Sequence, residues 1–186
     1  MTRQIALLAL GTRGDVQPYI ALGKALQAAG HGVRLLAGSS FEPWVRSHGL
    51  EFVPSIDIEA LMKSSGGLQW TEAEGQRGQL SAMKRLLNQH SEDMTAPMID
   101  LAQTSDLIIT GFVSEPFAFA LHERYRVPLL IGALQPYLPT GAGWASLVAP
   151  FPHRVSLFNR LGAEFGYRLI WNVAADAVNR LRGRIG

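Results

Sequence analysis

The residues of this chain that could most readily do chemistry form a short polar loop near its amino terminus. The loop is Gly11-Thr12-Arg13-Gly14, and Asp15 follows it directly. Glycine is the default residue of tight turns and an aspartate can cap a helix, so turn chemistry accounts for part of the pattern. A solvated cap needs only one small polar residue, whereas this loop carries a charged pair, Arg13 and Asp15. The pair favours a ligand-binding loop, with turn chemistry as the alternative.

A strand and a helix must position this loop. The apolar run from Ile5 to Leu10 predicts a buried strand, and a helix is expected from Val16 to Ala29, with Pro18 in its first turn. Proline is tolerated there because its missing N–H would have no intrahelical partner, and a carboxylate is favoured beside the positive end of the helix dipole. Open α/β sheets bind ligands at such junctions. The spacing excludes the Gly-x-Gly-x-x-Gly dinucleotide motif, and no Gly-Lys-Ser/Thr follows to make a P-loop.

The loop and the residues after it resemble the opening of the glycosyltransferase family 28 N-terminal domain. The resemblance rests on Gly11-Thr12-Arg13-Gly14-Asp15-Val16-Gln17-Pro18, followed by Leu22-Gly23-Lys24-Ala25-Leu26 and Gly30-His31. That domain is the first half of two-domain GT-B enzymes such as sterol glucosyltransferases and the glycosyltransferases of natural products. The resemblance implies a general-base role for Asp15 on an acceptor hydroxyl. It also implies that Gly11, Thr12, Arg13 and Gly14 help to neutralise the departing diphosphate of a nucleotide-sugar donor.

Three later segments supply candidate residues for acceptor binding. Trp70 lies in a polar, glycine-punctuated stretch, where it could line an acceptor pocket or pin the loop to the core. Phe112 and Glu115 follow a predicted buried strand, and Glu115 could instead favour the start of a helix. The loop after the next strand contributes Gln135, Pro136 and Tyr137. That last segment is similar to the proline-rich stretch that leads into the family's acceptor cleft.

The remaining pattern predicts an α/β fold. Besides the first strand, four apolar runs are expected to be strands, at residues 33–37, 51–54, 106–111 and 127–132. Helices that cross over between successive strands imply a parallel sheet. We therefore predict a Rossmann-like parallel sheet of at least five strands with helices on both faces. Residues 1–150 would form this acceptor-binding domain, and residues 151–186 a helical extension that packs on it.

Two helical regions raise specific expectations. Apolar residues near period 3.6 predict a helix from Leu80 to Gln103, which Pro97 should break or kink. A long helix with an apolar stripe is expected from Leu157 to Arg184. From Arg154 onward the chain has six arginines and two acidic residues, so the basic pI of 9.2 is a property of this tail. The helix is expected to close the domain, and peripheral contact with an anionic membrane is the alternative.

Composition bounds the class of protein. With 186 residues, 47% hydrophobic and 17% charged, the chain suits one globular domain, and no apolar run is long enough to span a membrane. The absence of cysteine excludes disulfides, thiolate nucleophiles and zinc–thiolate sites. The net charge of +2 is modest, and no nucleic-acid partner, cofactor or metal ion is expected. Met-Thr-Arg-Gln leads directly into a strand, so no signal peptide is expected and a cytoplasmic location is predicted.

These expectations combine into one functional hypothesis and one alternative. The chain would be the acceptor-binding half of a glycosyltransferase that transfers a hexose from a nucleotide-sugar co-substrate to a hydroxyl of a hydrophobic acceptor: a sterol, a lipid or a natural product. The family's donor site belongs to a C-terminal domain, in cis or on a separate chain, so this polypeptide alone is expected to transfer no sugar at a useful rate. The alternative is a non-catalytic module that binds a small molecule or a protein in the same cleft. A nucleotide-binding regulator is disfavoured by the missing phosphate motifs.

Overall fold

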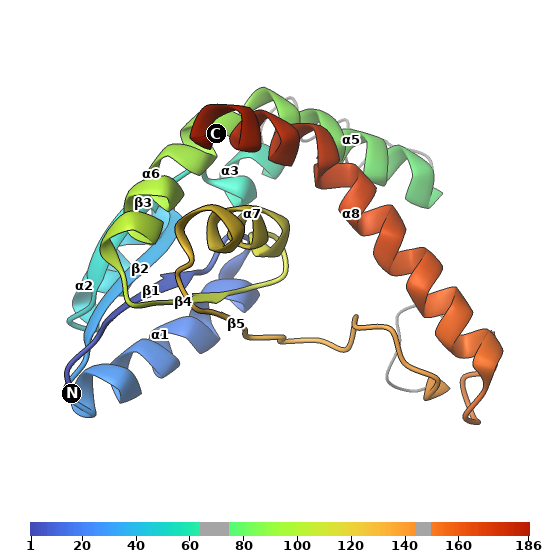
Figure 1. Cartoon of the computed structure of the whole chain (residues 1–186), viewed down its shortest axis with the longest axis horizontal. Helices are drawn as coiled ribbons and strands as arrows, with labels where there is room; N and C mark the ends of the chain where they lie inside the picture. Colours follow the sequence, from blue (N-terminus) through green and yellow to red (C-terminus); the bar gives the residue numbers. More distant parts are fainter. Residues whose placement is uncertain (64–74, 144–149) are drawn as a thin grey trace.

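The computed structural model describes the chain apart from residues 64–74 and 144–149. Trp70 is among the residues that are not described, so its predicted place in an acceptor pocket lies outside the described part. Figure 1 shows a sheet with helices around it and one long helix, α8 (Leu157–Ile185), whose first half extends away from the sheet.

Five parallel strands form one sheet, in the order β3-β2-β1-β4-β5. The strands are β1 (Gln4–Leu8), β2 (Gly32–Gly38), β3 (Glu51–Ser55), β4 (Leu107–Thr110) and β5 (Leu129–Ile131). In the centre, Leu7 of β1 pairs with Leu35 of β2 on one side and with Ile109 of β4 on the other. Each of the five apolar runs holds one strand, which confirms the predicted parallel sheet.

The sheet has a topological switch point between β1 and β4. From β1 the chain adds β2 and then β3 on one side, and it returns across the sheet to add β4 and β5 on the other. At such a point the connections after the two central strands leave toward opposite faces, and a crevice opens outside their carboxyl ends. The loop with Gly11 follows β1, and the loop with Phe112 follows β4. The fold therefore brings the two predicted loops to the same edge of the sheet.

Alternate strand residues supply two hydrophobic cores, one on each face of the sheet. Ile5 and Leu7 of β1 belong to the core shared with α1 (Arg13–Ala28) and α2 (Glu42–Ser47), which follows the short turn η1 (Ser39–Phe41). Ala6 and Leu8 belong to the larger core on the opposite face. The helices of that face are α3 (Ile58–Lys63), α5 (Gly75–Gln89), α6 (Ser91–Thr104), α7 (Glu115–Tyr125) and the second half of α8. The predicted cover of helices on both faces is confirmed.

Helix α1 begins earlier than the sequence analysis expects. Thr12 occupies the N-cap and Arg13 is the first helical residue, so Pro18 lies in the second turn. The prediction of a first-turn proline is wrong. Because Pro18 has no N–H, the carbonyl oxygen of Gly14, in the first turn of α1, lacks its usual helical hydrogen bond.

The predicted helix from Leu80 to Gln103 is two helices, and its expected break at Pro97 is wrong. The break falls at His90, which caps α6 with a non-helical backbone, and Pro97 lies inside α6. Thr95 on α6 donates its hydroxyl proton to the carbonyl oxygen of Ser91, at 2.7 Å. The tertiary packing of Met94 and Met98, both fully buried, holds α6 in place despite the proline.

Candidate functional site

Direct hydrogen bonds join the loop that follows β4 to the end of β1. The backbone N–H of Gly111 donates to the carbonyl oxygen of Leu8 at 3.0 Å. The buried Ser114 hydroxyl donates to the same oxygen at 3.0 Å and accepts from the Thr110 hydroxyl at 2.9 Å. These contacts hold the start of α7 against the end of β1, next to the loop with Gly11.

The Asp15 carboxylate forms part of the cap of α1. Its Oδ2 accepts hydrogen bonds from the Thr12 backbone N–H at 2.8 Å and from the Thr12 hydroxyl at 3.1 Å. Gly11 adopts a φ of +140°, and a Cβ there would lie 2.2 Å from the same oxygen, so this turn requires glycine. Asp15 is half-buried, and within the described part of the chain its Oδ1 accepts no hydrogen bond. The loop thus holds one carboxylate oxygen, Oδ2, through Thr12.

The N-terminus of α1 carries the groups that suit an anion. The backbone N–H groups of Arg13 and Gly14 donate to no acceptor among the described residues, and both residues are exposed. Such free amides, with the positive end of the helix dipole, attract phosphate oxygens. The Arg13 guanidinium lies 5.1 Å from the centre of the Trp44 ring, a cation–π contact that holds the side chain against α2.

Tyr19 of α1 is a buried residue that was not among the predicted site residues. Its hydroxyl donates to the carbonyl oxygen of Gly132 at 3.0 Å, and a Cβ on Gly132 would lie 2.4 Å from that hydroxyl. Burial and the nearby Asp15 carboxylate raise the pKa of Tyr19 to about 12. Tyr19 therefore acts as a neutral hydrogen-bond donor that ties α1 to the segment after β5.

Glu115 is a buried carboxylate, only 2% exposed, at the first position of α7. The Tyr137 hydroxyl donates to its Oε2, and the Tyr167 hydroxyl of α8 donates to its Oε1 at 2.8 Å. Glu115 also lies in the first turn of α7, where a carboxylate is favoured, as the alternative interpretation of this residue expects. Its two oxygens nevertheless serve to join three segments: α7, the loop after β5, and α8.

The two tyrosines of this cluster are held in their neutral form. Burial, followed by the hydrogen bond to Glu115, raises the pKa of Tyr167 to about 12. The same two causes raise the pKa of Tyr137 further above its ordinary value. The Tyr137 ring contacts Phe112 edge-on, with ring centres 4.7 Å apart, and stacks on Tyr167. The cluster thereby fixes Phe112, which is one wall of a neighbouring cavity.

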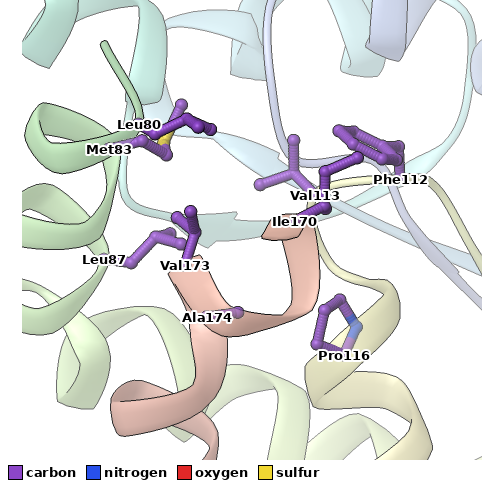
Figure 2. Close-up of a pocket in the computed structure, with 9 residues that line it drawn as sticks. All are labelled: Leu80, Met83, Leu87, Phe112, Val113, Pro116, Ile170, Val173 and Ala174. Carbon is purple, nitrogen blue, oxygen red and sulfur yellow. The ribbon is translucent and has the colours of Figure 1, made fainter. Parts of the chain in front are cut away.

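An apolar hollow of about 190 Å³ opens between α5, α7 and α8. Figure 2 shows Phe112 and Val113 from the loop after β4, Leu80 from α5 and Ile170 from α8 around it. Its other lining residues are Met83, Leu87, Pro116, Val173 and Ala174. A comparable apolar cavity of about 150 Å³ holds one benzene ring, so this hollow has room for a ring of that size.

The predicted acceptor residues that the structure describes differ in their position relative to the hollow. Phe112 lines the hollow, and Tyr137 and Glu115 support it from behind. Gln135 and Pro136 are exposed on the segment after β5 and do not line it. The residues that sequence reasoning missed are Tyr19, Tyr167 and the hollow walls on α5 and α8. The walls of the hollow show in the sequence only as apolar residues at helical spacing, which does not separate a cavity wall from ordinary core. Nothing near the two tyrosines in the sequence indicates their partners.

Comparison with known proteins agrees with this geometry. Residues 5–134 match the glycosyltransferase family 28 N-terminal domain. The chain is 31% identical, over 96% of its length, to a sterol 3-beta-glucosyltransferase of Emericella nidulans, and 29% identical, again over 96%, to one of Pichia angusta. It spans only 12% and 14% of those two proteins.

Solved structures show the same fold. The Streptomyces sp. SF2575 glycosyltransferase SsfS6, in its complex with thymidine diphosphate, superimposes with a TM-score of 0.60 at 20% identity. The match covers 96% of this chain and 45% of that one. Since the family pattern covers more than half of the chain and includes both switch-point loops, the chain belongs to glycosyltransferase family 28 as an N-terminal domain of the GT-B fold.

Proposed function

We propose that this domain binds the acceptor in a glycosyltransferase that moves a hexose from a nucleotide-sugar to a hydroxyl of a hydrophobic acceptor. The observation that carries the proposal is the pairing, at one switch point, of an apolar hollow with a half-buried carboxylate that has one oxygen without a described donor. Phe112 links the two, because it lines the hollow and follows β4, the direct neighbour of β1. The named relatives that act on sterols support the acceptor class.

The hollow suits the apolar end of the acceptor. Its walls are aliphatic and aromatic side chains, so a ring system gains free energy by leaving water, at roughly 25 cal/mol for each Å² buried. At about 190 Å³ it is smaller than the usual pocket of a drug-sized ligand, of roughly 300 Å³ or more. One end of the acceptor would therefore enter the hollow, while the hydroxyl end stays outside, toward the crevice.

We assign the role of proton acceptor to Asp15. In the proposed step, Oδ1 of Asp15 accepts the proton as the acceptor oxygen bonds to the anomeric carbon and the bond from that carbon to the diphosphate breaks. The diphosphate leaves with the electron pair, and the free amides of Arg13 and Gly14 meet its oxygens. The donor itself would be held by a second, C-terminal domain, for which the solved relatives have the length, since this chain covers 46% and 45% of two of them.

Replacing Asp15 tests the catalytic part of this proposal. In a chain that carries this domain together with a donor-binding domain, Asp15→Asn keeps an oxygen to accept from the Thr12 N–H but removes the base. We expect kcat to fall by about 10²–10⁴-fold with the acceptor KM nearly unchanged. Glu42→Gln, at an exposed carboxylate of α2, is the matched control. A kcat within a few-fold of the parent would refute the role of Asp15.

Filling the hollow tests the binding part. Ala174 is buried on α8 and lines the hollow, so Ala174→Phe should occupy it and weaken the binding of a fluorescent sterol to the chain by tenfold or more. Asn172→Phe, at an exposed position of the same helix, is the control and should leave binding unchanged. Equal sterol binding by both variants would contradict the proposed pocket. A loss of acceptor affinity on Asp15→Asn with kcat unchanged would instead assign Asp15 to acceptor binding alone.

A further inference from the structure

Two sides of the hollow belong to segments that are far apart in the sequence. The α7 side lies at the start of α7 and in the loop before it, and it consists of Phe112, Val113 and Pro116. The α8 side consists of Ile170, Val173 and Ala174 (Figure 2). Neither α8 nor any other helix that the structure describes is long and apolar enough to cross a membrane. The way in which α7 and α8 are held together therefore decides the shape of the hollow.

One carboxylate joins the two sides. Glu115 is the first residue of α7 and is almost completely buried. Its Oε1 accepts a hydrogen bond from the Tyr167 hydroxyl at 2.8 Å, and Tyr167 lies about one helical turn before Ile170 on α8. Its Oε2 accepts from the Tyr137 hydroxyl, and the Tyr137 ring contacts Phe112 edge-on. Each hydrogen bond thus ends on a residue that is next to a wall of the hollow.

The partners of Glu115 are neutral. Within the described part of the chain, no lysine, arginine or histidine forms an ion pair with it. Burial and the nearby carboxylate raise the pKa of both tyrosines, so both hydroxyls stay protonated and keep donating. Burying a charge costs free energy, and apolar residues of similar volume often replace a buried polar group without loss of stability. The contribution of the carboxylate is therefore geometric as well as energetic.

The two hydrogen bonds place α8 against α7 more specifically than the apolar contacts beside them. The two helices also meet through Phe119 and Trp171, whose ring centres lie 5.7 Å apart. Hydrophobic attraction has no preferred direction, whereas a hydrogen bond weakens steeply when its angle departs from the optimum. Two hydrogen bonds to one carboxylate therefore favour a single relative placement of the segments that carry the walls.

We propose that Glu115 is a positioning residue for the acceptor: through Tyr137 and Tyr167 it sets the placement of the α7 side against the α8 side, and with it the shape of molecule that the hollow accepts. Glu115 does not itself line the hollow, so it acts through the two tyrosines. This inference rests on the proposed function, because it takes the hollow as the place of the acceptor's apolar end. A rigid ring fits only where the walls keep their placement, whereas a flexible chain adapts its torsions to a looser hollow.

An apolar replacement of the whole cluster tests the proposal. Glu115→Leu, Tyr137→Phe and Tyr167→Phe together remove the carboxylate and both hydroxyls but keep both rings, so the stability should stay close to that of the parent. The probes are cyclohexylhexanol and dodecanol, which have equal numbers of carbon atoms and end in a ring and in a straight chain. Each is titrated against a fluorescent sterol bound to the 186-residue chain. We expect the triple variant to bind cyclohexylhexanol about tenfold more weakly and dodecanol within about twofold of the parent.

Two further variants separate positioning from folding. Glu115→Gln keeps one acceptor oxygen and gains an NH₂ group that can donate to a tyrosine oxygen, so it should retain the preference for the ring. Tyr167→Phe alone removes only the hydrogen bond to α8 and should lower the ratio of the two affinities in the same direction as the triple variant. The matched control is Tyr125→Phe, which removes an exposed hydrogen bond to Gln103, and neither of these two residues lines the hollow. Urea unfolding checks the stability of each variant.

The outcomes distinguish this proposal from the proposed function. An unchanged ratio of the two affinities in Tyr167→Phe and in the triple variant would overturn it, as would equal losses for both alcohols. A loss of preference in Glu115→Gln as large as that of the triple variant would also overturn it. If Ala174→Phe weakens sterol binding while the ratio stays constant, only the role of Glu115 fails. If Ala174→Phe leaves sterol binding unchanged, the proposed pocket fails and this inference fails with it.

Discussion

The buried carboxylate of Glu115 provides a sharp test of how the candidate site is held together. Tyr137→Phe removes the hydroxyl that donates to Oε2 and changes nothing else in the shape of the side chain. A hydrogen bond to a charged group contributes about 1.5–3 kcal/mol, and Glu115 is only 2% exposed, so water has little access to replace the donor. We expect Tyr137→Phe to lower the free energy of unfolding by about 1.5–3 kcal/mol, a large share of the roughly 5–15 kcal/mol typical of a domain.

A double-mutant cycle with Glu115→Leu isolates the interaction. In that background the Tyr137 hydroxyl has lost its acceptor, so Tyr137→Phe should cost almost nothing, and the two changes should be coupled by about 1.5–3 kcal/mol. Urea unfolding followed by circular dichroism measures all four free energies.

The matched control for this cycle is Tyr125→Phe. The Tyr125 hydroxyl accepts from Gln103 Nε2 at 3.2 Å in an exposed hydrogen bond, and its loss should change stability by less than about 0.5 kcal/mol. Additive effects of Tyr137→Phe and Glu115→Leu, within about 0.5 kcal/mol, would refute the reasoning that the carboxylate organises this cluster.

Three further predictions follow from the same contacts. Tyr19 and Tyr167, with pKa values of about 12 in the folded chain against 10.0 ordinarily, should add stability that is complete below pH 10 and lost as the pH rises toward 12; phenolate absorbance and unfolding at each pH measure this. Gly11→Ala places a Cβ 2.2 Å from Asp15 Oδ2 at a φ of +140° and should destabilise by about 1–3 kcal/mol in thermal unfolding, whereas an unchanged Tm would contradict the described turn. Pro18→Ala restores an N–H in the second turn of α1 at an exposed position and should raise stability by about 1–3 kcal/mol; a lower Tm would show that the ring has a packing role.

The sheet could be predicted from the sequence because parallel strands buried on both faces are continuous apolar runs. Residues 33–37 and 106–111 stand out in that way, and the structure contains β2 and β4 there. The break between α5 and α6 could not be predicted, because His90 carries no strong local signal whereas Pro97 carries a misleading one. Tertiary packing of α6 outweighs the local cost of the proline.

The candidate site was predictable only where its parts are close in sequence. The loop from Gly11 to Asp15 is a local motif, and its turn and cap depend on contacts within a few residues. Glu115 and Tyr167 are 52 residues apart, and nothing near either one indicates that they meet. The hollow is likewise formed by three helices whose relative placement depends on the whole fold.

Helix α8 contributes to two different surfaces of the domain. Ile170, Val173 and Ala174 form a wall of the hollow, while Phe158 and Phe165 point outward from the same helix a few turns away. The Tyr167 hydroxyl joins α8 to Glu115 between these two surfaces. A substitution that removes this hydrogen bond is therefore expected to act on both surfaces at once.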